Sequence, residues 1–110
     1  MQHSSLEDGR WAMMPFPQQM ANIGSETYRV LKALQTGKDV RAEGAFARAQ
    51  ELIDLTIKYG RHGLGPTARG ALLEELCRFR ELFCAAYLSK DIEELATLNK
   101  YLDQFTLIRN

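Results

Sequence analysis

The sequence contains little of what enzymes and metalloproteins use for chemistry. Its 110 residues include two histidines and two cysteines, and no Cys-x-x-Cys or Glu-x-x-His pair occurs. His3 lies in a polar N-terminal stretch and His62 in a glycine-rich one, so neither is set beside a Ser or Cys nucleophile on an expected helix. We therefore expect no metal, no cofactor and no catalytic residue, and the sequence favours a protein that is not an enzyme.

The chain also lacks a net charge and a long apolar run. Basic and acidic residues number 14 each, whereas a nucleic-acid-binding protein usually carries a basic excess. No apolar segment approaches the roughly 20 residues that a membrane-spanning helix needs. The first residues are polar and acidic, which is not the pattern of a signal peptide. From the sequence we expect a cytoplasmic protein that binds neither a membrane nor nucleic acid.

What the sequence does contain is helical periodicity. Turn residues at Gly37, at 60–66 and at 89–91 separate four segments in which apolar residues recur every three or four positions. Short connections between helices favour antiparallel neighbours. The prediction is an all-α fold in which residues 17–110 form a single domain, a four-helix antiparallel bundle built as two stacked helical hairpins.

The ends of the expected helices carry recognisable signals. Asp39 suits the N-cap of the second helix, and Pro66 suits the first turn of the third. Asp91 and Glu94 have the spacing of a capping box at the start of the fourth. That helix then carries a narrow apolar seam typical of bundle packing. The seam is Leu95, Leu98, Leu102 and Phe105.

Residues 1–16 are expected to form a polar tail followed by an apolar arm. The prolines near the end of this segment disfavour a helix that begins here, so we predict an extended arm that covers the core. The alternative is a contact with a second subunit, because exposed apolar segments usually mark interfaces. In that case Trp11, Met14 and Phe16 would form the contact.

The two cysteines share the third expected helix. Cys77 and Cys84 are seven residues apart, which separates them by about 10 Å along a helix, beyond the reach of a disulfide. We therefore expect two reduced thiols buried in the core.

One loop has the composition of an anion site. Arg61, His62 and Arg69 surround glycines at a helix N-terminus, where free N–H groups attract anions. The segment lacks the Lys-Ser/Thr pair of a P-loop, so a plain inter-helix turn is the alternative. Helical ribonuclease domains of the HEPN type resemble the expected architecture, but their Arg-x4-6-His motif is missing because Arg61 directly precedes His62.

A second group of charged residues falls in or beside apolar stripes. Arg80 interrupts the stripe of the third helix, Asp54 interrupts an apolar run of the second, and Glu26 and Arg29 follow a polar line on the first. If the three helices face one another, these four side chains could converge. They would then form either structural salt bridges or a pocket for a small anionic or phosphoester ligand, including an enzymatic one.

A resemblance to a known family is carried by Ala42, Phe46 and Ala49. Their Ala-x3-Phe-x2-Ala spacing resembles the second helix of a tetratricopeptide repeat, in which small residues let two helices approach closely. The preceding helix lacks the Trp, Leu-Gly and Tyr positions of that family, and no second copy follows 34 residues later. The resemblance therefore implies a tightly packed helical hairpin.

Three classes of function follow from these features. The leading hypothesis is a non-catalytic helical protein that forms a homodimer or binds another protein, since neutral charge leaves little repulsion between copies. The alternative is the anionic-ligand site of Glu26, Arg29, Asp54 and Arg80. Nucleic-acid binding through Arg61, Arg69 and Arg78 is the least favoured, because the helix beside them is acidic.

Overall fold

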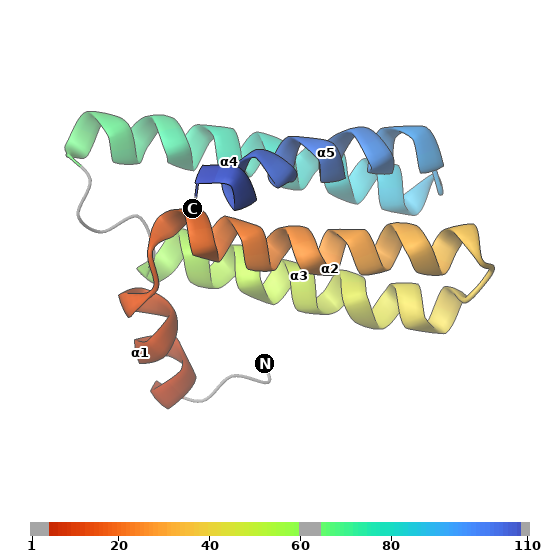
Figure 1. The fold of residues 1–110 in the computed structure, drawn as a ribbon, viewed down its shortest axis with the longest axis horizontal. Coiled ribbons are helices and arrows are strands. Elements are labelled where there is room, and N and C mark those ends of the chain that lie inside the picture. The colour runs from red at the N-terminus through yellow and green to blue at the C-terminus, as the bar shows by residue number, and fades with distance from the viewer. Residues whose placement is uncertain (1–4, 60–64, 109–110) are drawn as a thin grey trace.

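The structure, a computed structural model, contains five α-helices (Figure 1). It describes residues 5–59 and 65–108, and within them the side chains of residues 9–59 and 65–105. All regular secondary structure in these two ranges is helical, which confirms the predicted all-α fold. The helices are α1 (Ser5–Met13), α2 (Phe16–Gln35), α3 (Asp39–Tyr59), α4 (Pro66–Leu88) and α5 (Ile92–Ile108).

The turn between α2 and α3 is closed by Gly37. This residue has a φ of 71°, in the left-handed region that glycine adopts without steric cost. Its N–H donates to the carbonyl of Leu34 (3.3 Å), and the N–H of Lys38 donates to the carbonyl of Ala33 (2.8 Å). This pair of hydrogen bonds is the Schellman motif, and it satisfies two carbonyls at the end of α2.

The turn between α4 and α5 repeats this geometry with a lysine in place of the glycine. Lys90 has a φ of 54°, its N–H donates to the carbonyl of Tyr87, and the N–H of Asp91 donates to the carbonyl of Ala86. Asp91 then caps α5, because its Oδ1 accepts the N–H of Glu94 at 3.0 Å. The predicted N-cap Asp91 is confirmed, whereas the N–H of Asp91 donates to the carbonyl of Ala86 and not to Glu94, so the cap is the first half of the expected capping box.

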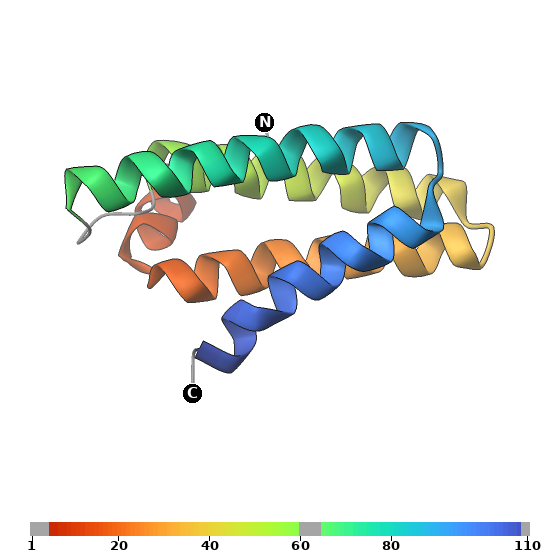
Figure 2. The same ribbon diagram turned by 90° about the horizontal axis from the view of Figure 1, so that it is seen from above.

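Helix α2 is the central element of the fold. It packs extensively on both α3 and α5, whereas α4 makes a smaller contact with each of these two helices. Figure 2 shows α5 crossing α2 obliquely, so that its C-terminal end lies away from α4. The second predicted hairpin is therefore open, and the regular bundle of two stacked hairpins is not confirmed.

The α2–α3 pair is close because its contact is lined with small residues. Ala42, Ala45 and Ala49 of α3 are almost completely buried. Without larger side chains in the way, the two backbones approach each other closely. The tightly packed hairpin that the Ala-x3-Phe-x2-Ala spacing implied is confirmed in this pair, as their extensive packing also indicates.

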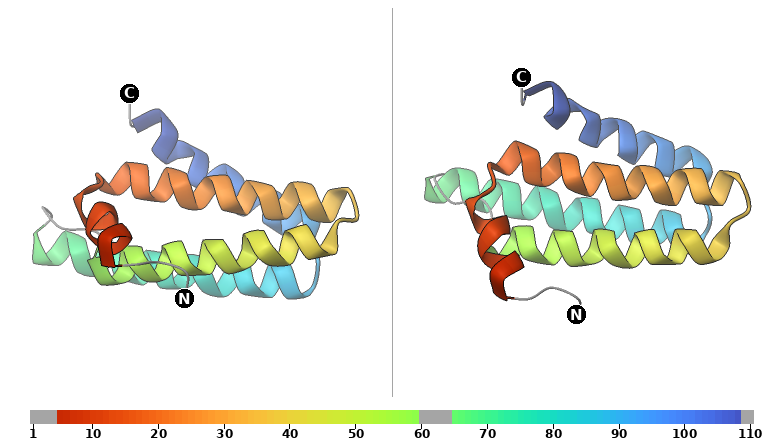
Figure 3. Two further views of the ribbon diagram at one scale, coloured as in Figure 1. Left: turned by 90° about the horizontal axis from the view of Figure 1, so that it is seen from below. Right: turned by 60° about the horizontal axis from the view of Figure 1, so that its bottom comes forward.

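The N-terminal arm is not extended, which corrects the sequence prediction. Residues Ser5–Met13 form α1, which lies across α3 (Figure 3). A proline disfavours helical geometry in the residue before it and cannot continue a helix, but it does not prevent a helix that ends earlier. A helix can therefore precede Pro15, and α1 ends at Met13, two residues earlier.

Buried hydrogen bonds fix α1 to the rest of the molecule. The indole Nε1–H of Trp11 donates to Oγ1 of Thr56 at 3.0 Å, and both side chains are buried. The fully buried Gln19 of α2 donates from Nε2 to the carbonyls of Trp11 (2.9 Å) and Met14 (3.1 Å). Gln19 thus donates to carbonyls at and just beyond the end of α1, and that of Trp11 also accepts the N–H of Met14 at 3.0 Å.

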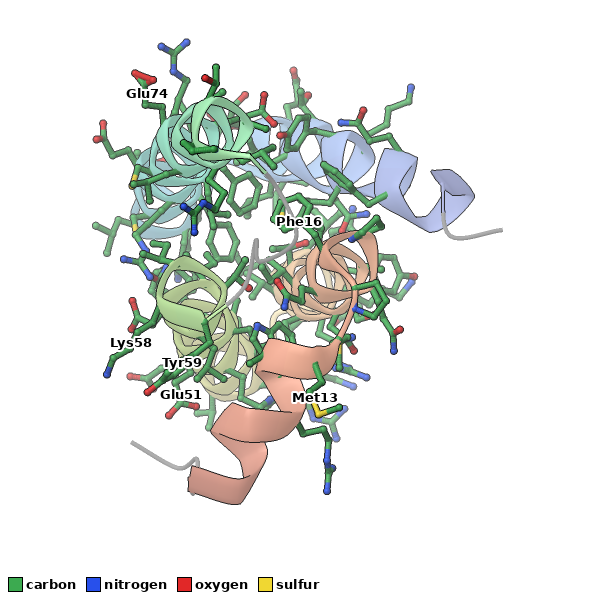
Figure 4. All side chains as sticks on the ribbon, turned by 90° about the vertical axis from the view of Figure 1, so that its left-hand side faces the viewer. Met13, Phe16, Glu51, Lys58, Tyr59 and Glu74 are labelled. Atoms are coloured by element: carbon green, nitrogen blue, oxygen red, sulfur yellow. The ribbon has the colours of Figure 1, made fainter. Side chains whose placement is uncertain are left out.

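A continuous series of aromatic contacts fills the space between α3, α4 and α5. Phe79 and Phe83 of α4 stack with ring centroids 5.6 Å apart, and Phe83 also meets Phe46 of α3 at 5.1 Å. Phe79 continues to Tyr101 of α5 at 6.1 Å. The series ends where Phe105 meets Phe16 edge to face at 6.0 Å. In Figure 4 the Phe16 side chain is directed to the interior, whereas Met13 and Glu74 point outward.

The expected burial of both cysteines is wrong for Cys77. Its side chain is exposed, and Cys84 is half-buried, where its sulfur accepts a hydrogen bond from Nε2 of Gln50 at 3.3 Å. The reason is that α4 buries only a narrow stripe, and Cys77 lies next to that stripe. The stripe consists of Leu76, Phe79, Phe83 and Ala86.

The left-handed backbone of Lys90 yields a test of this fold. A non-glycine residue in this conformation costs about 1 kcal/mol. The free energy of unfolding of Lys90→Gly should therefore exceed that of Lys90→Ala by about that amount. Both variants lose the exposed ion pair of Lys90 with Asp39 (3.0 Å), so its loss cancels in the comparison. Urea unfolding measures the difference. Equal stabilities would contradict the turn geometry described here.

Candidate functional site

The surface of the α2–α3 pair carries a groove of about 530 Å³. Both helices contribute residues with the same spacing, so that one face of each helix forms one wall. We call this feature the basic groove. From α2 it is lined by Tyr28, Arg29, Lys32, Ala33 and Thr36, from the turn by Lys38, and from α3 by Val40, Arg41, Gly44, Ala45 and Arg48.

The charge of the basic groove has one sign. Residues 16–59 contain six basic and five acidic side chains, which are nearly balanced in number. Five of the six basic residues line the groove, and no acidic side chain does so among the described residues. The sixth basic residue, Lys58, lies outside the groove, near the C-terminal end of α3. The fold therefore separates charges that are mixed along the sequence, and cations on one concave surface attract anions.

The floor of the basic groove is apolar. Ala33 and Ala45 are buried beneath it, and Gly44 adds no side chain. Two large side chains project into solvent at its edges, with Val40 84% exposed and Tyr28 51% exposed. These two exposed side chains offer apolar contact area that the chain itself leaves uncovered.

One carboxylate positions two of the groove's arginines. Glu26 is largely buried, and it accepts hydrogen bonds from Nη1 of Arg29 (2.8 Å) and from Nε of Arg48 (3.3 Å). Both arginine side chains remain more than half exposed. A guanidinium has five N–H donors, so each arginine keeps the capacity to bind an anion while Glu26 holds it in place.

The predicted cluster of Glu26, Arg29, Asp54 and Arg80 is divided into two separate pairs. Glu26 contacts Arg29, and Asp54 contacts Arg80, but no contact joins the pairs. The reason lies on α3, where Arg48 and Asp54 are six residues apart. Six residues turn a helix by about 240°, so these side chains point to different neighbours.

The Arg80–Asp54 pair links α4 to α3. Arg80 donates from Nη2 to Oδ1 of Asp54 and to the backbone carbonyl of Gln50. It is the more buried partner, since Asp54 is 58% exposed. Its Nε is buried without a hydrogen-bond partner, a feature shared among the described side chains only by Oε1 of Gln19. These contacts agree with a structural salt bridge between helices, one of the two alternatives that the sequence left open.

The other predicted site residues are not gathered in one place. Arg61 and His62 lie outside the described residues, so the anion-binding loop stays a prediction. Arg69 is exposed near the start of α4. Of the proposed interface residues, Trp11 is buried against α3 and Phe16 packs on α5. The sulfur of Met14 accepts a hydrogen bond from Asn22 at 3.4 Å, so all three are in contact with the chain's own residues.

The described residues hold neither a clustered set of metal ligands nor a helix of membrane-spanning character. No group of three or more His, Cys, Asp or Glu side chains there could hold a metal ion. None of the described helices is long and apolar enough to cross a bilayer. Burial, and then the hydrogen bond and charge of Glu75, raise the pKa of Tyr101 above its ordinary value, but this pair lies between α4 and α5, outside the groove.

Sequence reasoning missed the basic groove as a unit. A signal was present, because Arg29 and Lys32 are three residues apart and Arg41 and Arg48 are seven apart, which places each pair on one helical face. The neutral overall charge obscured it. Comparisons with protein-family models, curated proteins and solved structures found no significant match.

The role of Glu26 can be tested by Glu26→Gln. This change leaves Arg29 and Arg48 close together without the carboxylate between them, so we expect a loss of about 1–2 kcal/mol in the free energy of unfolding. Glu43→Gln removes an exposed carboxylate on α3 and should change stability by less than about 0.5 kcal/mol. Denaturant unfolding of both variants makes the comparison. Equal effects would show that Glu26 does not hold the two arginines.

Proposed function

We propose that the protein is a non-catalytic interaction module that binds an acidic segment of a partner protein in the basic groove. One observation carries the proposal: five cationic side chains surround an apolar floor, with Val40 and Tyr28 exposed at its edges. Carboxylates of a partner would meet the cations, and its apolar side chains would cover the floor. Charge complementarity of this kind sets specificity and the rate of association.

The apolar part of the groove favours a protein segment over a phosphate polymer. A nucleic-acid backbone is bound mainly through contacts between cations and phosphates. Such a ligand would leave Val40 exposed and would gain nothing from the floor of Ala33, Gly44 and Ala45. An acidic helix that carries leucines would use both features, in the way that amphipathic helices fill apolar grooves in other proteins.

The composition of the lining supports binding without catalysis. Hydroxyl groups of Tyr28 and Thr36 are present, but the lining includes no histidine or carboxylate that would act as their base. The small anionic ligand that the sequence left open as an alternative would use the same cations. It would not need Val40, and the experiment below separates the two.

We also propose that the protein works in a reducing compartment such as the cytoplasm. The support is Cys77, which is free and exposed on α4. Exposed thiols persist where glutathione and thioredoxin keep them reduced.

The proposal is tested with a helix-forming peptide of about 16 residues that carries Glu and Leu on one face. We expect Arg41→Glu to weaken binding about tenfold or more, because it places a like charge against the peptide. Lys58→Glu changes the net charge equally but outside the groove, and it should change the affinity by less than about twofold. Fluorescence anisotropy of a labelled peptide gives both dissociation constants.

Two control peptides define the partner class. Replacing each Glu by Lys should abolish binding, and replacing each Leu by Ser should weaken it. If the Ser peptide binds as well as the Leu peptide, the groove recognises anions alone and the small-ligand or phosphate alternative is favoured. If Lys58→Glu weakens binding as much as Arg41→Glu, the groove is not the site.

A further inference from the structure

Four of the large exposed apolar side chains among the described residues fall into two pairs. These residues expose five such side chains, and Tyr28 and Val40 belong to the basic groove. Leu82 and Leu88 belong to α4, where Leu88 is 78% and Leu82 43% exposed, and they are turned about 120° apart around that helix. Met13, at the end of α1, belongs to neither pair. Single exposed leucines are common, so their surroundings decide whether this second pair has a role.

The surroundings of Leu82 and Leu88 are acidic. Between residues 81 and 94 the chain has four acidic side chains and one basic side chain, Lys90, which is paired with Asp39. Arg78, one turn earlier on α4, marks the limit of this region. We call the exposed surface of this region the acidic face. Its acidic and large apolar members are Glu81, Leu82, Leu88, Asp91 and Glu93, and the exposed Ala85, Ser89 and Lys90 lie among them.

The acidic face has the chemistry that the basic groove is proposed to bind. Glu81 and Leu88 are seven residues apart and therefore lie on the same side of α4, whereas Leu82 is turned about 100° from Glu81 and about 120° from Leu88. Asp91 and Glu93 continue the negative charge into the start of α5. The acidic face thus combines carboxylates with exposed leucines across the end of α4, the turn and the start of α5, and the chain carries both halves of a complementary pair.

We infer that the acidic face of one copy of the chain occupies the basic groove of a second copy. The inference rests on the proposed function of the groove and names its partner. Leu88 would cover the apolar floor, with Leu82 at the flank of the contact, while the carboxylates meet the groove's cations. The zero net charge of the chain leaves no overall repulsion to oppose the contact.

The contact joins two different surfaces, so it is head to tail. The groove belongs to the α2–α3 pair and the acidic face to α4 and the start of α5, which form separate layers in Figure 1. A contact between unlike surfaces leaves one groove and one acidic face free in each pair of copies. Such heterologous contacts continue into rings or open chains. This differs from the homodimer that the sequence suggested, which closes on itself.

The test is the molar mass in solution, measured by light scattering on a concentration series up to about 1 mM. For the wild type we expect the mass to rise above the 12.5 kDa of one chain as the concentration increases. Arg41→Glu in the groove and Leu88→Arg on the acidic face should each remain at the mass of one chain. Met13→Arg adds the same charge at an exposed position outside both surfaces and should behave like the wild type.

Mixing the two defective variants gives the decisive result. Arg41→Glu retains an intact acidic face, and Leu88→Arg retains an intact groove, so the mixture contains one unaltered interface. We expect an equimolar mixture to reach twice the mass of one chain, although each variant alone does not. A mixture that stays at the mass of one chain would overturn the head-to-tail contact.

The same experiments separate this inference from the proposed function. If the wild type stays at the mass of one chain up to the highest concentration but binds the Glu/Leu peptide in the groove, the self-association is wrong and the function stands. If the peptide also fails to bind, both are wrong.

Discussion

The position of α4 depends on its aromatic contacts with the neighbouring helices. Helix α4 packs less extensively on α3 and α5 than α2 does. Contacts between aromatic rings form much of the packing of α4 on these two helices. Phe83 meets Phe46 of α3, and Phe79 meets Tyr101 of α5. Large rings bridge a wider gap between helices than aliphatic side chains, and each pair adds about 0.5–1.5 kcal/mol beyond its buried area. They allow α5 to diverge from α4 while the core between them stays filled.

The α2–α3 pair uses the opposite solution, and this is what creates the groove. Alanines at the contact between α2 and α3 bring the two backbones together. Few side chains therefore lie over the outer surface between these helices. The long cationic side chains at its rim leave the apolar floor between them accessible. Glu26 holds two of these cations in place from below. The α2–α3 pair therefore combines three features: closely packed backbones, basic side chains gathered on one surface, and the exposed Val40.

Local signals in the sequence were sufficient for most of the fold. Pro66 begins α4, Asp91 caps α5, and Leu95, Leu98, Leu102 and Phe105 are all buried as expected. These features depend on residues within one or two turns of each other. The divergence of α5, the two separate ion pairs and the basic groove depend on which faces of different helices meet. Crossing angles and relative rotation are set by the packing of the whole core, which a single helical pattern does not specify.

The central claim is that the basic groove is the surface that an acidic partner occupies. Amide chemical shifts, recorded by NMR while the Glu/Leu peptide is added, test it most directly because they locate the contact by residue. The account predicts that the largest changes fall within residues 28–48, on the C-terminal half of α2 and the N-terminal half of α3. Changes centred on the Arg80–Asp54 pair or on α1, with residues 28–48 unaffected, would contradict it.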